Sequence, residues 1–185
     1  MKHNDYQTFY ENISTDIRQK KNGVRVLNLV NSILTLAMYI LYPLMIAVIL
    51  LNGFLKDGIP EAIHLALPYI LVPGTSFLLL TVIRDRLDWK RPYEEYDILP
   101  LIQKDTKGHS MPSRHAFSIT VIAMCLLSLN VPAGLICLFC SVVLCAVRVL
   151  GGVHYPRDVA AGFVIGLIAG ALMFILCSAN TLSHL

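Results

Sequence analysis

Charged residues are scarce in this chain. Asp, Glu, Lys and Arg make up 15% of its 185 residues, whereas an ordinary soluble domain has about 25%. Hydrophobic residues make up 56% of the chain, and its mean hydropathy is +0.64. Because the apolar residues come in long blocks, the composition does not fit an ordinary soluble domain and predicts an all-α integral membrane protein.

Other features are also missing. The first 22 residues lack the early apolar stretch of a secretory signal peptide, so we expect no signal peptide there. The sequence has no basic tract and no interleaving of basic with aromatic residues, and its net charge is only +3. Nucleic acid is therefore not an expected partner.

Cysteine is absent outside the apolar blocks. The five cysteines all lie within them: Cys125, Cys137, Cys140, Cys145 and Cys177. An odd number of lipid-embedded cysteines does not fit a disulfide framework. Cys137 and Cys140 form a C-x-x-C pattern, which we interpret as small packing residues rather than as a metal or redox site.

The apolar blocks predict the membrane spans. A spanning helix needs about 20 mainly apolar residues, and four blocks meet that length: Val24–Leu51, Ala62–Ile83, Val131–Leu150 and Val159–Cys177. A fifth block, Ala116–Leu129, reaches it only if the helix begins near Pro112. We expect a bundle of five transmembrane helices, with six as the alternative.

The N-terminal 22 residues are polar, but their apolar members are spaced like one face of a helix. These members are Tyr6, Phe9, Tyr10, Ile13 and Ile17. Spacing of three and four residues predicts an amphipathic helix, lying on the membrane surface or against the bundle. A frayed tail is the alternative.

A long loop of about 30 residues, from Arg84 to Arg114, separates the second and third spans. Loops of this size are usually functional or disordered. Two spans separate this loop from the short connection at Gly151–Tyr155, so both lie on one side of the membrane. We therefore expect three charged segments to meet there: residues 84–92, 112–115 and 148–158.

The side of the membrane follows from the basic residues. Basic residues such as Arg18 and Arg25 flank the first span on the charged side, and the opposite connections carry little beyond Lys56. The positive-inside rule then predicts that the charged face lies in the cytoplasm, in a multi-pass protein of the cell membrane.

The charged segments carry residue types that suit a phosphoryl group. The guanidinium groups of Arg84, Arg91 and Arg148 match phosphate oxygens, and Ser113 precedes a helix N-terminus, where backbone N–H groups are free. His154 and His115 allow one imidazole to attack phosphorus and the other to protonate the leaving oxygen.

Asp158 follows His154 by four residues, one helical turn, so its carboxylate is placed to orient the imidazole and to stabilise the positive charge that develops there. The arginines supply the charge neutralisation that a metal ion gives elsewhere. We therefore expect no metal and no cofactor.

These residues resemble the three signature segments of the type 2 phosphatidic acid phosphatase superfamily, which includes vanadium haloperoxidases and glucose-6-phosphatase. The chain has Arg84, then "DRLDWK", then Arg91-Pro92; it has "PSRH" at residues 112–115; and it has Arg148, "VLGGV", His154, "YPR", Asp158. All three segments occur in the family order.

The chain departs from the family pattern in three places. Arg84 replaces the usual Lys, Arg114 replaces a Gly whose bare backbone approaches phosphate, and Val147 replaces a Ser. Arg114 adds a cation at this point, and its side chain either contacts phosphate or narrows the pocket.

The resemblance implies metal-independent hydrolysis of a phosphomonoester or diphosphate through a phosphohistidine. His154 would be the nucleophile, Asp158 its orienting carboxylate and His115 the general acid. The phosphate would be bound by a set of five residues: Arg84, Arg91, Ser113, Arg114 and Arg148. The expected substrate is a lipid phosphate such as phosphatidic acid, phosphatidylglycerol phosphate or a polyprenyl diphosphate, drawn from the surrounding membrane lipids.

Two alternatives stay open: a lipid phosphotransferase that uses the same histidines and aspartate, and a non-catalytic lipid-binding membrane protein. The chain is expected to divide into an N-terminal segment, residues 1–22, and a membrane-embedded phosphatase domain, residues 23–185, with the signature segments within residues 84–158. The headgroup and the oligomeric state do not follow from the sequence.

Overall fold

The computed structural model describes residues 3–182, with side chains described from residue 6 to residue 177, and all its regular elements are helices. In chain order they are α1 (His3–Gln19), α2 (Gly23–Leu87), α3 (Pro92–Glu95), α4 (Arg114–Leu129), α5 (Val131–Leu150) and α6 (Pro156–Leu182). No strand occurs in this part of the chain, so the predicted all-α membrane fold is confirmed.

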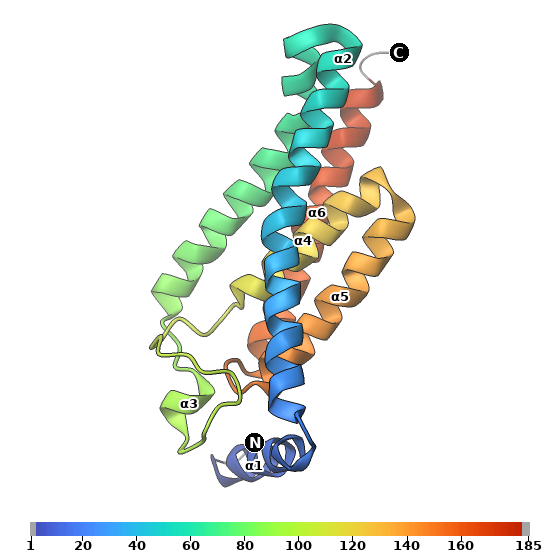
Figure 1. Ribbon diagram of the computed structural model, residues 1–185. Helices are drawn as coiled ribbons and strands as arrows, with labels where there is room; N and C mark the ends of the chain where they lie inside the picture. The colour runs from blue at the N-terminus through green and yellow to red at the C-terminus, as the bar shows by residue number, and fades with distance from the viewer. Residues whose placement is uncertain (1–2, 183–185) are drawn as a thin grey trace.

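Helix α2 contains the first two predicted spans. Its backbone leaves helical geometry at Asp57 and Gly58, where the chain reverses, so that two arms run in opposite directions (Figure 1). Gly58 has a φ of 77°, which glycine adopts at little cost. The arms then pack together: a Cβ at Gly53 would lie 2.5 Å from the Cα of Ala62, and the Tyr42 hydroxyl donates to the Tyr69 carbonyl at 2.9 Å.

Among the described residues, α2, α5 and α6 are long and apolar enough to cross a membrane. Helix α4, the third predicted span, is the short one, as its apolar block indicated, and it begins at Arg114, two residues after Pro112. Its 16 residues span about 24 Å at a rise of 1.5 Å per residue, less than the hydrocarbon core of about 30 Å. By itself, α4 therefore does not reach across the hydrocarbon core.

Polar caps fix where the later helices begin. The Ser113 Oγ accepts from the Ala116 N–H at 3.5 Å at the start of α4, and the Asn130 Oδ1 accepts from the Ala133 N–H at 3.0 Å at the start of α5. Helix α6 begins with Pro156, whose fixed φ suits a first helical turn.

Close contact between α4 and α6 aligns the ends of these two helices. Three glycines spaced by four residues, Gly162, Gly166 and Gly170, form a stripe on α6 against α4. A Cβ at Gly162 would lie 2.4 Å from the Ser113 carbonyl oxygen. Small residues at this spacing let helix backbones approach each other in membranes.

Helix α1 lies across the same end of the bundle as α3 and the long loop, while the C-terminal end of α6 lies at the opposite end (Figure 1). Of its predicted apolar face, Tyr6 and Tyr10 are buried against Ile98 and Tyr155, whereas Phe9 is 43% exposed. The amphipathic helix thus packs against the bundle, the second of the two placements expected from its sequence.

The glycine stripe gives a stability test. We expect Gly162→Ala to lower the thermal unfolding midpoint in detergent by several degrees, because the added methyl meets a backbone carbonyl that cannot move aside cheaply. Gly74→Ala is the matched control, since a Cβ at Gly74 meets nothing within 4 Å and alanine favours a helix interior. Equal midpoints for the two variants would contradict the close packing of α4 on α6.

Candidate active site

The connection between α5 and α6 holds His154 in a buried turn. The Gly151 carbonyl accepts the N–H groups of Leu101 and Ile102, both at 3.1 Å, which ties the turn to the long loop. Gly152 has a φ of 74°, and a Cβ there would lie 2.5 Å from the Tyr10 hydroxyl. The turn is therefore fixed from one side by the loop and from the other by α1.

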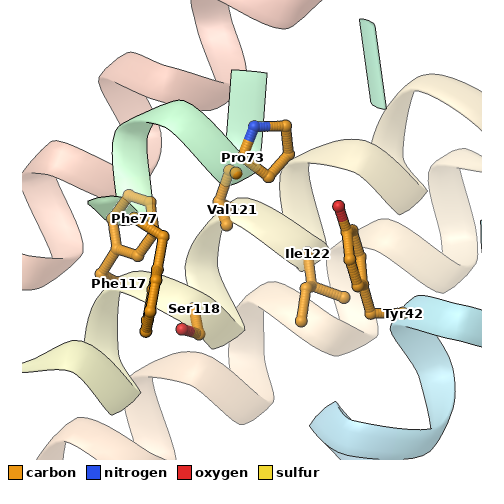
Figure 2. A pocket seen from close by; sticks show the side chains of 8 residues that line it. Tyr42, Pro73, Phe77, Phe117, Ser118, Val121 and Ile122 are labelled. Atoms are coloured by element: carbon orange, nitrogen blue, oxygen red, sulfur yellow. The ribbon is translucent and has the colours of Figure 1, made fainter. Parts of the chain in front are cut away.

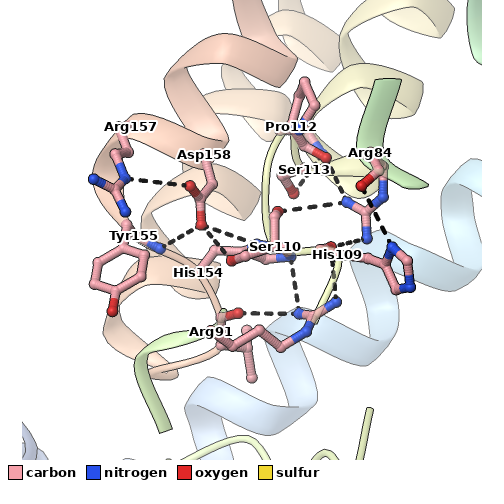
Figure 3. Close-up of polar contacts among 12 residues, drawn as sticks. Arg84, Arg91, His109, Ser110, Pro112, Ser113, His154, Tyr155, Arg157 and Asp158 are labelled. Atoms are coloured by element: carbon pink, nitrogen blue, oxygen red, sulfur yellow. Dashed lines mark hydrogen bonds and ion pairs between the residues drawn. The ribbon is translucent and has the colours of Figure 1, made fainter. Parts of the chain in front are cut away.

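The two ring nitrogens of His154 face different groups. Nδ1 lies 3.6 Å from the Asp158 Oδ2, and Nε2 lies 3.5 Å from the Arg91 Nη1 (Figure 3). Burial lowers the pKa of His154, and the charges of Arg148 and Arg91 lower it further, against the opposing effect of Asp158. The neutral imidazole, with a lone pair available on Nε2, is the favoured form.

Asp158 is fully buried in the first turn of α6. Its Oδ2 accepts from the Ser110 hydroxyl and, at 3.0 Å, from the Tyr155 N–H. Its carbonyl oxygen accepts from the Ser113 N–H at 2.9 Å, which joins α6 to the start of α4. The carboxylate is thus held in one position beside His154.

Ser110 was not identified from the sequence. Its hydroxyl donates to Asp158 and lies 3.5 Å from the His154 Nδ1 (Figure 3). No spacing rule marks it, because it approaches these residues through the folding of a loop.

Arg84 and Arg91 are buried, and both bond to backbone carbonyls. Arg84 donates to the carbonyls of Pro112 and His109. Arg91 donates to the Gly108 carbonyl at 3.1 Å and to the Val153 carbonyl at 3.1 Å. These two guanidinium groups hold the end of the long loop against the turn that carries His154.

Arg148 differs from the other two arginines. Its side chain is 3% exposed, and only its Nη1 has a partner, the Asn31 Oδ1 at 3.1 Å. Its Nε and Nη2 are buried without a hydrogen-bond partner. Buried donors of this kind are costly unless a ligand satisfies them, so Arg148 has free donors for an anion.

The start of α4 brings His115 and Arg114 to the same face. His115 is partly buried and Arg114 is exposed. The cations near His115 are Arg148, Lys104 and Arg114, and no described carboxylate forms an ion pair with it. The structure thus brings all eight predicted site residues to one end of the bundle.

Lys104 also belongs to this cluster. Its side chain is partly buried, whereas its neighbours Gln103 and Asp105 are exposed. Burial lowers the pKa of Lys104 to about 8, with contributions from Arg148, Arg91, Arg84 and Arg114. No signature segment includes position 104, so the motifs do not point to this residue.

The Arg157 side chain stacks on two aromatic rings. Its guanidinium carbon lies 4.8 Å from the centroid of Trp89 and 4.7 Å from that of Tyr155. Its Nε also lies 3.8 Å from the Asp158 Oδ1. Arg157 therefore lies over the Asp158 carboxylate on the Oδ1 side.

Comparisons with known proteins agree with this geometry. A crystal structure of a transmembrane PAP2-type phosphatidylglycerolphosphate phosphatase from Bacillus subtilis is similar to the chain, with a TM-score of 0.67 and 26% sequence identity. The match covers 95% of this chain and 88% of that one. No curated protein matches the chain significantly.

The family model for the PAP2 superfamily matches residues 36–182, which include every signature residue of the site. With an all-helical membrane fold and the three segments gathered at one end, the chain belongs to the PAP2 superfamily.

Proposed function

We propose that the protein is a membrane-embedded lipid phosphatase that hydrolyses a phosphomonoester or diphosphate through a phosphohistidine, without a metal ion. The observation that carries this proposal is the buried Arg148, whose unpaired Nε and Nη2 lie in the same cluster as His154. A phosphate oxygen satisfies such donors, and a bound phosphate then lies within reach of a neutral imidazole.

In this mechanism the His154 Nε2 forms a bond to phosphorus, and Asp158 stabilises the positive charge that develops on the ring. The 3.6 Å separation of the Nδ1 and Oδ2 atoms shortens to a hydrogen bond as that charge grows. Ser110 keeps Oδ2 in place. Arg148 and the N-terminus of α4 bind phosphate oxygens, and His115 protonates the leaving oxygen or later activates water.

An apolar cavity supports a lipid substrate. It has a volume of about 240 Å³ and lies between α2 and α4 (Figure 2). Its lining is formed by Tyr42, Pro73, Gly74, Phe77, Phe117, Ser118, Val121 and Ile122. Phe117 and Ser118 follow His115 within one helical turn, so a hydrocarbon chain in this cavity leaves its phosphate near the histidines.

The neighbouring phosphatase from Bacillus subtilis is described as acting on phosphatidylglycerolphosphate. We include that lipid among the candidate substrates, beside phosphatidic acid and polyprenyl diphosphates. Measuring phosphate release by the purified protein in detergent, with each of these lipids in turn, identifies the substrate class.

We expect His154→Ala to lower phosphate release by more than about a thousandfold, because the covalent step loses its nucleophile. The control is His64→Ala, a histidine of the second arm of α2, which should keep its activity within about twofold. Both variants are checked for membrane insertion.

The wild-type activity should persist in EDTA, because the arginines rather than a metal ion neutralise the phosphate. Activity that is lost on chelation and restored by a divalent ion would contradict the metal-independent mechanism.

The pH dependence tests the state of His154. The pKa of His154 is lowered, so its imidazole stays neutral at pH values below the ordinary histidine pKa of about 6.5. The low-pH inflection of the kcat/KM profile, its acid limb, should therefore lie below about pH 6.5. Arg148→Gln removes a charge that lowers this pKa, so the limb should move to higher pH. A limb that does not move in this variant reports the substrate phosphate instead of His154.

We also propose that the protein lies in the plasma membrane with its site facing the cytoplasm, on the basis of Arg18 and Arg25 beside the first arm of α2. Asp105, exposed in the long loop, is a suitable labelling position. In intact cells Asp105→Cys should resist a membrane-impermeant maleimide until the cells are permeabilised. Labelling of intact cells would reverse the orientation.

A further inference from the structure

A proline in the second arm of α2 leaves one backbone carbonyl without its usual helical partner. Pro73 has no N–H, so the Tyr69 carbonyl, four residues earlier, cannot accept the hydrogen bond of a regular α-helix. The Tyr42 hydroxyl, on the first arm of α2, donates to this carbonyl at 2.9 Å instead. An unpaired carbonyl in an apolar interior is costly, so this hydrogen bond fixes the position of the Tyr42 ring.

Tyr69 is also connected to α4. Its side chain is buried, and its hydroxyl lies 2.9 Å from the Ser128 Oγ. The hydrogen bonds of Tyr42 and Tyr69 therefore join both arms of α2 to α4. The Tyr42 ring cannot swing away without breaking the first of these bonds.

The Tyr42 ring borders two apolar cavities. In the first cavity, of about 240 Å³, Tyr42 stands at one end and Phe77 and Phe117 stand at the other (Figure 2). The second cavity, of about 180 Å³, is lined by Met38, Tyr39, Tyr42, Pro43, Ser118 and Ile122. Tyr42, Ser118 and Ile122 are common to both linings. Because Tyr42 is the largest of these three side chains, its ring is the main barrier between the two cavities.

The first cavity continues the face of α4 that carries a site histidine. His115, Ser118 and Ile122 are spaced by three and four residues, so they lie on one face of the helix. Ser118 and Ile122 line the cavity. The lining therefore begins within one helical turn of His115.

The second arm of α2 shows the same relation. Arg84 and Phe77 are seven residues apart, which places them on one face of the helix and about 10 Å apart along its axis. The Tyr69 carbonyl, which holds Tyr42, is eight residues beyond Phe77, about 12 Å further. A hydrocarbon chain that leads away from the phosphate residues thus passes Phe77 before it reaches Tyr42.

Gly74 opens the first cavity to the outside of the bundle. It lines the cavity and is exposed, and a Cβ there would meet nothing within 4 Å. A cavity of about 150 Å³ holds a benzene ring, so a volume of about 240 Å³ holds a segment of one hydrocarbon chain. One chain of a lipid in the surrounding bilayer can therefore enter sideways at Gly74.

From these contacts we propose that Tyr42 is a specificity-determining residue, whose ring closes the far end of the first cavity and selects lipids with a slender chain at that depth. This inference rests on the proposed function and adds a residue that selects the hydrocarbon chain rather than the phosphate. A straight chain ends beside the ring. A bulky group at the same depth needs the volume that the Tyr42 ring occupies.

The test compares two alkyl phosphates, dodecyl phosphate and its analogue with a phenyl ring on the last carbon. Both are mixed into the same detergent micelles, so that they compete for the protein and the assay gives the ratio of their kcat/KM values. We expect wild-type protein to favour dodecyl phosphate by at least about tenfold, since a poorly fitting group in an apolar pocket costs about that factor.

Variants of Tyr42 locate the selection. Tyr42→Ala should lower the ratio by at least about fivefold, because the phenyl ring takes the place of the lost side chain. Tyr42→Phe should keep most of the ratio, because the ring remains, although the Tyr69 carbonyl loses its donor and the thermal unfolding midpoint falls. Leu44→Ala, on the same arm with a side chain that is 56% exposed, is the control and should keep both the activity and the ratio.

The opposite change fills the first cavity. Gly74→Leu should lower kcat/KM for dodecyl phosphate at least about tenfold more than for ethyl phosphate, because the new side chain extends into open space that the long chain uses. Gly74→Ala, which adds only a methyl group, should show much less of this difference. Gly74→Leu tests the cavity even if Tyr42→Ala does not fold.

Four results would overturn the inference: wild-type protein without a preference between the two alkyl phosphates, Tyr42→Ala with the ratio of Leu44→Ala, Gly74→Leu that affects dodecyl and ethyl phosphate equally, or cleavage of other lipid phosphates but of neither alkyl phosphate. In each case a His154-dependent phosphatase activity leaves the proposed function standing. If no lipid phosphate is cleaved, the proposed function fails and the role of Tyr42 fails with it.

Discussion

Guanidinium groups bonded to backbone carbonyls hold this structure together at its charged end. Arg84 and Arg91 are buried, and charges removed from water are costly unless hydrogen bonds compensate. Here the carbonyls of Gly108, His109, Pro112 and Val153 supply that compensation. The carbonyls leave the positive charge in place, as carboxylates would not, and they tie the long loop to the turn that carries His154. The same contacts that order the loop therefore keep the site attractive to anions.

Helix packing sets the positions of the two histidines. The glycine stripe of α6 lets it approach α4 closely, and the hydrogen bond from the Ser113 N–H to the Asp158 carbonyl joins the first turns of both helices. His115 and His154 thus belong to elements that do not move independently. Helix α1 completes the arrangement, because Tyr10 packs on Gly152 and accepts the Leu101 N–H at 3.2 Å.

Several features of the site follow from the sequence alone. Successive apolar blocks cross the membrane in opposite directions, which predicts that the segments with Arg91, His115 and His154 lie on one side. The structure brings these segments together at one end of the bundle. The spacing of His154 and Asp158 predicts their adjacency, since four residues make one helical turn. Neither the role of Ser110 nor the partial burial of Lys104 is predicted in this way. Both lie in an irregular loop, where no periodicity relates sequence position to direction.

Local patterns in the sequence determine the composition of the spans, the caps at Ser113 and Asn130, and the identity of the charged residues, because each depends on neighbours within a few positions. Long-range packing decides the rest. It packs α1 against the bundle, and it divides the arginines into two that bond to carbonyls and one, Arg148, with free donors. These outcomes depend on which distant backbone groups come within hydrogen-bond distance, and only the folded chain fixes that.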